Sequence, residues 1–135
     1  MKVVLDTNVL VSGIFYSGPP SAILRAWEQR KFRLVLTLPI FEEYKEVAVR
    51  LGKHFPAIDI TRLMDLIIVE SDLCSPVALA HPVCADPKDD KFIAAAISGK
   101  AEVIVSGDKH LLKVSGYHGI SVLTPRVFIE RLIKD

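Results

Sequence analysis

Four carboxylates in separate segments of the chain have the placement needed to bind a metal ion together. Asp6 and Asp108 each follow a short apolar run, and Glu43 and Asp90 lie near the starts of two helical patterns. Carboxylates within a few ångströms of one another repel, and a divalent cation removes that repulsion. Oxygen ligands favour Mg²⁺ or Mn²⁺ over zinc, and such an ion can activate water and polarise a phosphoryl oxygen. These residue types therefore indicate phosphodiester hydrolysis.

Apolar runs that alternate with helical patterns would position these carboxylates. The runs typical of buried strands cover residues 3–5, 34–36, 103–105 and 120–123. Helical patterns cover residues 9–15, 21–30, 38–51 and 60–67, a segment that opens at Asp86-Pro87, and a closing segment after Thr124-Pro125. The stretch 71–85 leaves room for one further strand. This alternation predicts an α/β fold with three layers, α/β/α, around a central, mostly parallel sheet of four or five strands.

All four carboxylates should meet at one edge of this sheet. In open parallel sheets the ligand site lies beyond the carboxyl ends of the strands, where the strand order reverses. Asp6 and Asp108 directly follow predicted strands, so both are expected at that edge. Glu43 and Asp90 are near the N-terminal ends of helices that start from the same edge. The topology, rather than the spacing in the sequence, predicts the site.

The helix predicted from residue 38 to about residue 51 has one apolar face. Thr37 is a candidate N-cap, and Pro39 is tolerated in the first turn. Glu43 lies at the margin of the apolar face, whereas Glu42 points nearly opposite to it. Glu43 is therefore the better placed of the two to reach a site at the edge of the core. The face itself consists of Ile40, Tyr44, Val47, Ala48 and Leu51.

The large apolar side chains have the placement of core residues rather than of a base-stacking surface. In the closing helix, Val127, Phe128 and Leu132 are expected to point inward. The aromatic residues assigned to the core are Trp27, Phe32, Phe41, Tyr44 and Phe55.

Three aspartates, Asp86, Asp89 and Asp90, crowd the start of the helix that follows residue 85. Asp86 is the expected N-cap, and acidic side chains in a first turn stabilise a helix start without binding a ligand. On a helical wheel, Asp89 and Asp90 both lie close to the apolar face. The pattern alone therefore does not separate a metal ligand from a helix-capping residue here.

Four motifs together resemble the PIN-domain nucleases, and most of all the VapC-like toxin group. They are VVLDTNVLVS, the stretch 37–47 with Glu43, DPKDDKFIAAA and VIVSGDKHLL, and they extend over essentially the whole chain. The resemblance implies a single-domain endoribonuclease that depends on Mg²⁺ or Mn²⁺ and cleaves single-stranded RNA to 5′-phosphate and 3′-hydroxyl products. It also implies a homodimer that often pairs with an antitoxin protein.

The resemblance also assigns roles to individual residues. The catalytic, metal-binding residues it implies are Asp6, Glu43, Asp90 and Asp108. Asn8 matches a polar residue of the first motif, and Ser106 matches a hydroxyl position where many relatives have threonine. Asp90 is chosen over its neighbours from the resemblance, and Asp86 and Asp89 are kept as candidates for further metal ligands beside their helix-capping role.

Composition limits the broad class of the protein. The chain has 135 residues, half of them hydrophobic, with a net charge of +1, which fits one domain over residues 1–135. This near-neutral charge neither supports nor excludes a nucleic-acid partner. Two cysteines, no leader-like N-terminus and no apolar run near 20 residues predict a cytoplasmic protein without a membrane span.

Other readings of the acidic motifs remain open. A catalytically silent PIN-like module that binds RNA or protein would keep the fold, although all four acidic positions are filled. An aspartyl phosphatase would use Asp6 as phosphoryl acceptor and Ser106 as its hydroxyl residue, but Asn8 occupies the place where that family carries a second aspartate.

The cationic side chains near the motifs have two interpretations, and a zinc site nearby has little support from the ligand spacing. Lys88, Lys91, Lys109 and His110 either contact RNA phosphates or are solvated helix residues. A zinc site built from Cys74, His81, Cys84 and His110 would need a ligand spacing that matches no familiar pattern.

Overall fold

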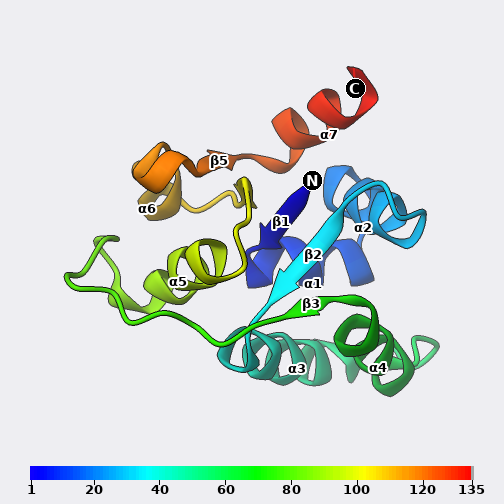
Figure 1. Ribbon diagram of the computed structural model, residues 1–135. Helices are drawn as coiled ribbons and strands as arrows, with labels where there is room; N and C mark the ends of the chain where they lie inside the picture. Colours follow the sequence, from blue (N-terminus) through cyan, green and yellow to red (C-terminus); the bar gives the residue numbers. More distant parts are fainter. Residues whose placement is uncertain (135) are drawn as a thin grey trace.

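A parallel five-stranded sheet with strand order β3-β2-β1-β4-β5 forms the centre of the molecule, as the computed structural model of residues 1–134 shows (Figure 1). The strands are β1 (Lys2–Leu5), β2 (Arg33–Leu36), β3 (Asp72–Leu73), β4 (Val103–Val105) and β5 (Ser121–Leu123). In the centre of the sheet, Leu5 of β1 pairs with Val105 of β4. The predicted three-layer α/β/α fold is confirmed, and β3 is the further strand for which residues 71–85 left room.

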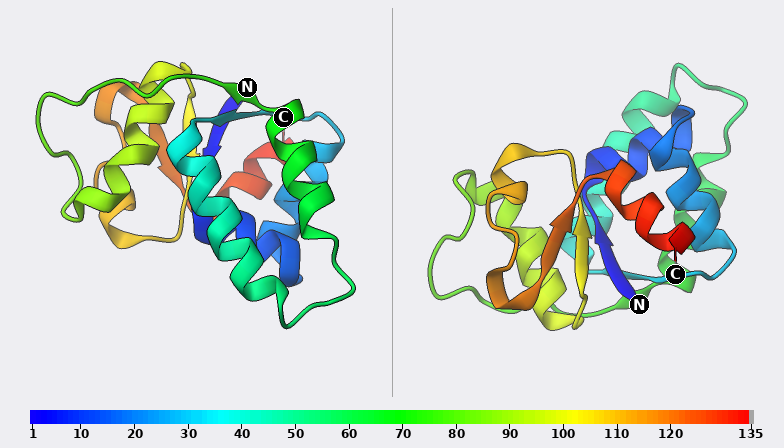
Figure 2. Two further views of the ribbon diagram at one scale, coloured as in Figure 1. Left: turned by 90° about the horizontal axis from the view of Figure 1, so that it is seen from below. Right: turned by 90° about the horizontal axis from the view of Figure 1, so that it is seen from above.

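Helices cover both faces of this sheet (Figure 2). α5 packs against β1, β2 and β4 on one face, and α7 lies on the other face beside α2. α1 packs against α2 and α3, and α4 packs against α3. The helices are α1 (Thr7–Phe15), α2 (Pro19–Glu28), α3 (Leu38–Gly52), α4 (Ile60–Glu70), α5 (Asp90–Ser98), α6 (Lys109–Leu112) and α7 (Pro125–Lys134), with 3₁₀ turns η1 (Pro87–Asp89) and η2 (Tyr117–Gly119).

Two close contacts fix the helices around the sheet's centre. A Cβ atom on Gly99, at the end of α5, would lie 2.4 Å from Val35 Cγ1, so only glycine lets the helix end approach β2 this closely. Tyr44 of α3 is fully buried, and its hydroxyl donates a hydrogen bond to the carbonyl of Leu5. This bond ties the first half of α3 to the end of β1.

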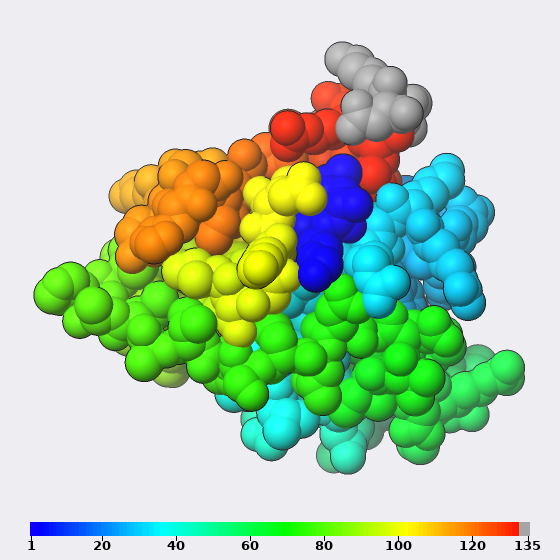
Figure 3. Space-filling model, viewed as in Figure 1, coloured from blue at the N-terminus to red at the C-terminus, as the bar shows by residue number. Residues whose placement is uncertain are grey.

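The segment between β3 and α5 has no regular secondary structure between residues 74 and 86. It runs from the β3 edge of the sheet toward α5, and part of it forms a projection at the left of the space-filling view (Figure 3). None of the helices within residues 1–134 combines the length and the apolar character needed to span a membrane.

Most core predictions are confirmed, and two local ones are wrong. Trp27, Phe32 and Tyr44 are buried. Thr37 occupies the N-cap position of α3, but its buried hydroxyl has no hydrogen-bond partner among residues 1–134, so its side chain does not cap the helix. Val127 is exposed, because Phe128 faces the core and its neighbour on the helix lies about 100° away.

The start of α5 also differs from the prediction. Asp86 is an N-cap, as expected, but it caps the 3₁₀ turn η1, with Lys88 N–H donating to Asp86 Oδ1 over 3.0 Å. The α-helix itself begins only at Asp90. A 3₁₀ turn advances about 120° per residue rather than 100°, so side-chain directions around Asp89 differ from those of one continuous α-helix.

Candidate active site

The carboxyl ends of β1 and β4 meet at the point where the strand order reverses. Asp6 follows β1 and Ser106 follows β4, and Asp6 N–H donates to Val105 O over 3.0 Å. The fully buried Ser106 Oγ donates to Asp6 Oδ2 over 2.6 Å and accepts from Asp108 N–H over 2.9 Å. One hydroxyl therefore joins the two aspartate-bearing loops.

Both aspartates are further held as helix caps. Asn8 N–H donates to Asp6 Oδ1 over 3.4 Å at the start of α1. Asp108 caps α6 by accepting from His110 N–H over 2.7 Å and from Leu111 N–H over 3.3 Å. Because each cap uses one carboxylate oxygen, the second oxygen of Asp108 remains available to a ligand.

Glu43 reaches the same place from α3. Thr7 Oγ1 donates to one of its carboxylate oxygens, and Lys91 Nζ forms an ion pair with the other. Thr7 belongs to α1 and Lys91 to α5, so the Glu43 side chain joins three helices. The prediction that Glu43 rather than Glu42 points toward the site is consistent with this placement, since Glu42 is exposed.

The three aspartates before α5 separate into two groups. Asp86 and Asp89 line the cavity that also contains Asp6, Glu43 and Asp108. Asp90 instead accepts hydrogen bonds from two backbone N–H groups, Cys84 N at 2.7 Å and Val83 N at 3.2 Å. The structure does not bring Asp90 into this cavity, because its carboxylate is turned toward the segment that precedes η1.

The cavity has a volume of about 300 Å³ and a strongly acidic lining. Among the described residues that line it, six are acidic and Lys88 alone is basic. The lining consists of Asp6, Thr7, Asn8, Glu43, Glu46, Val47, Asp86, Lys88, Asp89, Phe92 and Asp108. This excess of negative charge at the reversal point of the sheet fits a cation-binding site.

A larger cavity of about 620 Å³ does not have these properties. It lies between α2, the start of β2 and α4, and Arg30, Arg33, Glu28 and Glu70 are among its lining residues. Arg33 begins β2, so this cavity is at the amino end of the strand, opposite to the edge where Asp6 lies. Its described lining residues combine acidic and basic side chains, and they do not form a cluster of carboxylates that could bind a metal ion.

Burial, and then electrostatic repulsion within the acidic cavity, raise the pKa values of two lining carboxyls. Burial raises the pKa of the Asp6 carboxyl above its usual value, and Asp108 and Glu43 raise it further. Burial also raises the pKa of Asp89, and repulsion from Asp108 and Asp86 adds to this shift. The lining residues therefore do not neutralise one another, and a bound cation would remove the repulsion.

The raised pKa of Asp6 predicts a pH dependence of stability in the metal-free protein. A raised folded-state pKa gives stability that is present below the usual value of 3.8 and is lost as the pH rises through the folded value. Asparagine does not ionise, so Asp6→Asn should gain stability relative to wild type between about pH 4 and about pH 7. Urea denaturation of both proteins with a chelator at the two pH values measures this difference. A relative stability that stays constant or falls over this range would contradict the shift.

Sequence reasoning missed several side chains around the cavity. Thr7 and Lys91 hold Glu43, although neither was assigned that role. Glu46 also lines the cavity, and its place one turn after Glu43 was a signal that could have identified it. Lys88, which the sequence already offered as a phosphate contact, is exposed and lines the cavity, whereas Lys109 is exposed and does not line it.

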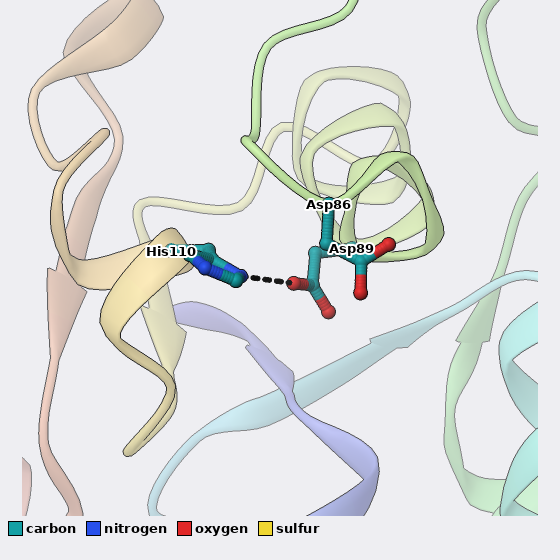
Figure 4. A group of neighbouring side chains, drawn as sticks. All are labelled: Asp86, Asp89 and His110. Carbon is teal, nitrogen blue, oxygen red and sulfur yellow. Dashed lines mark ion pairs between the residues drawn. The ribbon is translucent and has the colours of Figure 1, made fainter.

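His110 is a further neighbour of the acidic cluster. Its Nδ1 atom lies 3.7 Å from Asp89 Oδ2 and 3.7 Å from Asp108 Oδ1. Asp86, Asp89 and His110 each offer a ligand atom within 4.8 Å of the others. Figure 4 shows the imidazole from α6 facing the carboxylate of Asp89, with Asp86 beside Asp89 on the turn before α5.

Comparison with known families decides the membership of the chain. A family model described as a PIN domain matches residues 2–110, a span that includes every cavity-lining residue. The chain belongs to the PIN-domain family. The PIN domain is also 31% identical over 151 residues to "Uncharacterized protein MJ1680" of Methanocaldococcus jannaschii, covering 99% of this chain and 93% of that protein. PIN domains are generally nucleases, so hydrolysis of nucleic acid is the activity that the family indicates.

The PIN resemblance drawn from the four motifs is thus confirmed at the level of the family. The narrower resemblance to the VapC-like toxin group is not supported by this relative, whose printed name gives no function.

Proposed function

We propose that this PIN domain is a metal-dependent endoribonuclease that hydrolyses phosphodiester bonds of single-stranded RNA. The observation that carries the proposal is the acidic cavity at the reversal point of the sheet. Asp6, Glu43 and Asp108, three of the four carboxylates expected there, all line it. We further propose that Asp89, which lines the cavity, takes the metal-binding place first given to Asp90.

The donor set fits Mg²⁺ or Mn²⁺. The side chains that would hold the ion are the carboxylates of Asp6, Glu43, Asp89 and Asp108, with Asp86 beside them. A cavity of about 300 Å³ leaves space for an ion that keeps several of its water ligands, as Mg²⁺ usually does. When bound, such an ion supplies an activated water nucleophile and stabilises the charge that develops on the phosphoryl and leaving oxygens.

The surrounding residues orient these carboxylates. Ser106 fixes one oxygen of Asp6, and Thr7 and Lys91 fix the carboxylate of Glu43. These fixed orientations matter because carboxylate side chains that are already in place lose little conformational entropy when the substrate binds. Asn8 and Lys88 also line the cavity, where an amide and an ammonium group can donate to a backbone phosphate.

Cleavage of a circular single-stranded RNA tests the endonuclease assignment, since a circle has no end for an exonuclease. The PIN domain should linearise the circle with Mn²⁺ and not with a chelator, and the resemblance implies 5′-phosphate and 3′-hydroxyl ends. Intact circles in the presence of Mn²⁺ would contradict the proposal. Calorimetry then separates the alternative: a domain that binds RNA but no Mn²⁺ would be a catalytically silent binding module.

The proposal extends to the biological context implied by the VapC-like resemblance. In this context, the protein is a cytoplasmic homodimer that acts as the toxin of a toxin–antitoxin pair. Expression in a bacterial host should then arrest growth, and co-expression of a protein encoded beside it should relieve the arrest. Normal growth at high expression of the active nuclease would remove the toxin assignment and leave the nuclease assignment intact.

A further inference from the structure

The imidazole of His110 lies beside the carboxylates of the site and offers a nitrogen donor. α6 begins directly after Asp108, and the cap of this helix includes the bond from His110 N–H to Asp108 Oδ1. The same bond keeps the His110 side chain beside the carboxylate that caps its helix. From there Nδ1 faces Asp89, which belongs to the turn before α5.

The distances around this imidazole fit a shared ion better than direct pairing. Nδ1 lies 3.7 Å from oxygens of both Asp89 and Asp108, which is too long for a hydrogen bond. Two donors that bind one ion over bonds of about 2.1 Å are about 3 to 4 Å apart. Asp86 completes a set of three donors within 4.8 Å of one another.

The donors belong to elements that are already held in place. Asp86 caps η1 through one oxygen, and Asp108 caps α6. The Asp89 side chain is only 17% exposed, whereas the His110 side chain is 45% exposed. Asp86, Asp89 and Asp108 thus belong to the cavity wall, and the imidazole lies beside Asp89 and Asp108 as the more exposed donor.

We propose that His110 is a ligand of the metal site and gives it a preference for divalent transition-metal ions over Mg²⁺. The inference rests on the proposed function, because it concerns the ion held by the same carboxylates. Mg²⁺ is a hard ion that takes oxygen ligands, whereas imidazole nitrogen binds transition metals, with affinities rising from Mn²⁺ toward Co²⁺. A nitrogen donor therefore strengthens binding of Mn²⁺ and Co²⁺ and adds little for Mg²⁺.

Metal-binding measurements on His110→Gln test this preference without an activity assay. The variant should bind Co²⁺ and Mn²⁺ at least about tenfold more weakly, with Mg²⁺ affinity changed less than about twofold. Pulsed electron paramagnetic resonance of the Mn²⁺-loaded wild type should show coupling to an imidazole nitrogen, and His110→Gln should lose that coupling. His54→Gln is the matched control, because His54 is exposed beyond the far end of α3.

The outcomes distinguish this inference from the proposed function. Wild-type protein that binds Mn²⁺ without nitrogen coupling, or a His110→Gln variant that binds Co²⁺ as wild type does, overturns the role of His110 and leaves the nuclease proposal standing. Wild-type protein that binds none of the three ions overturns both. A loss of coupling in His110→Gln but not in His54→Gln supports the assignment.

Discussion

Replacing Asp6 with asparagine should lower Mn²⁺-dependent RNA cleavage at least about a thousandfold, a loss of about 4 kcal/mol of transition-state stabilisation. Asp6 is buried at the reversal point between β1 and β4, and it lines the cavity from the centre of the sheet. Asparagine keeps the size of the side chain and an oxygen that can accept from Ser106 or Asn8. It removes the negative charge that attracts the cation, so the loss should appear in both metal affinity and turnover.

The matched control for this change is Asp59→Asn. Asp59 also caps a helix, α4, by accepting from Arg62 N–H over 3.1 Å, but it lies outside the acidic cavity. The control separates loss of a capping charge from loss of a metal-binding charge. Initial cleavage rates at saturating Mn²⁺, with circular dichroism of each variant, provide the comparison. Undiminished cleavage by folded Asp6→Asn would remove Asp6 from the active site.

Asparagine at positions 89 and 90 should produce opposite defects, although the two aspartates are adjacent. Asp89→Asn should weaken Mn²⁺ binding and reduce cleavage by about a hundredfold without loss of stability, because its carboxylate lines the cavity. Asp90→Asn should lower the free energy of unfolding by about 1–3 kcal/mol, since an amide accepts only one of the bonds from Val83 and Cys84 well.

Urea denaturation and Mn²⁺ calorimetry on both variants separate these defects, and each variant serves as the control for the other. The prediction requires Asp90→Asn to retain Mn²⁺ affinity within a few-fold of wild type under conditions where it is folded. The opposite pattern, with metal binding lost at residue 90 and kept at residue 89, would return the metal-ligand role to Asp90.

The order of the strands explains why much of the site was predictable from the sequence. An apolar run followed by an aspartate places that aspartate at the carboxyl end of a strand, which holds for Asp6 and Asp108. The apolar stripe of α3 gave the direction of Glu43 in the same way. These inferences depend on strand ends and helix faces, which a periodic pattern determines.

The remaining parts of the site depend on features that have no periodic signature. The distinction between Asp89 and Asp90 follows from η1, because a 3₁₀ turn changes the direction of each side chain within it. The ion pair between Lys91 and Glu43 joins residues 48 positions apart, and His110 meets Asp89 across two different elements. Such contacts arise only when the sheet brings the helices together.

Diffraction from crystals soaked in Mn²⁺, measured for anomalous scattering at the manganese absorption edge, tests the central claim most directly. The account predicts an anomalous peak inside the cavity, within bonding distance of carboxylate oxygens of Asp6, Asp89 or Asp108 and of His110 Nδ1. A cavity without manganese at saturating concentration, or manganese bound instead at Asp90 beside Val83 and Cys84, would contradict it.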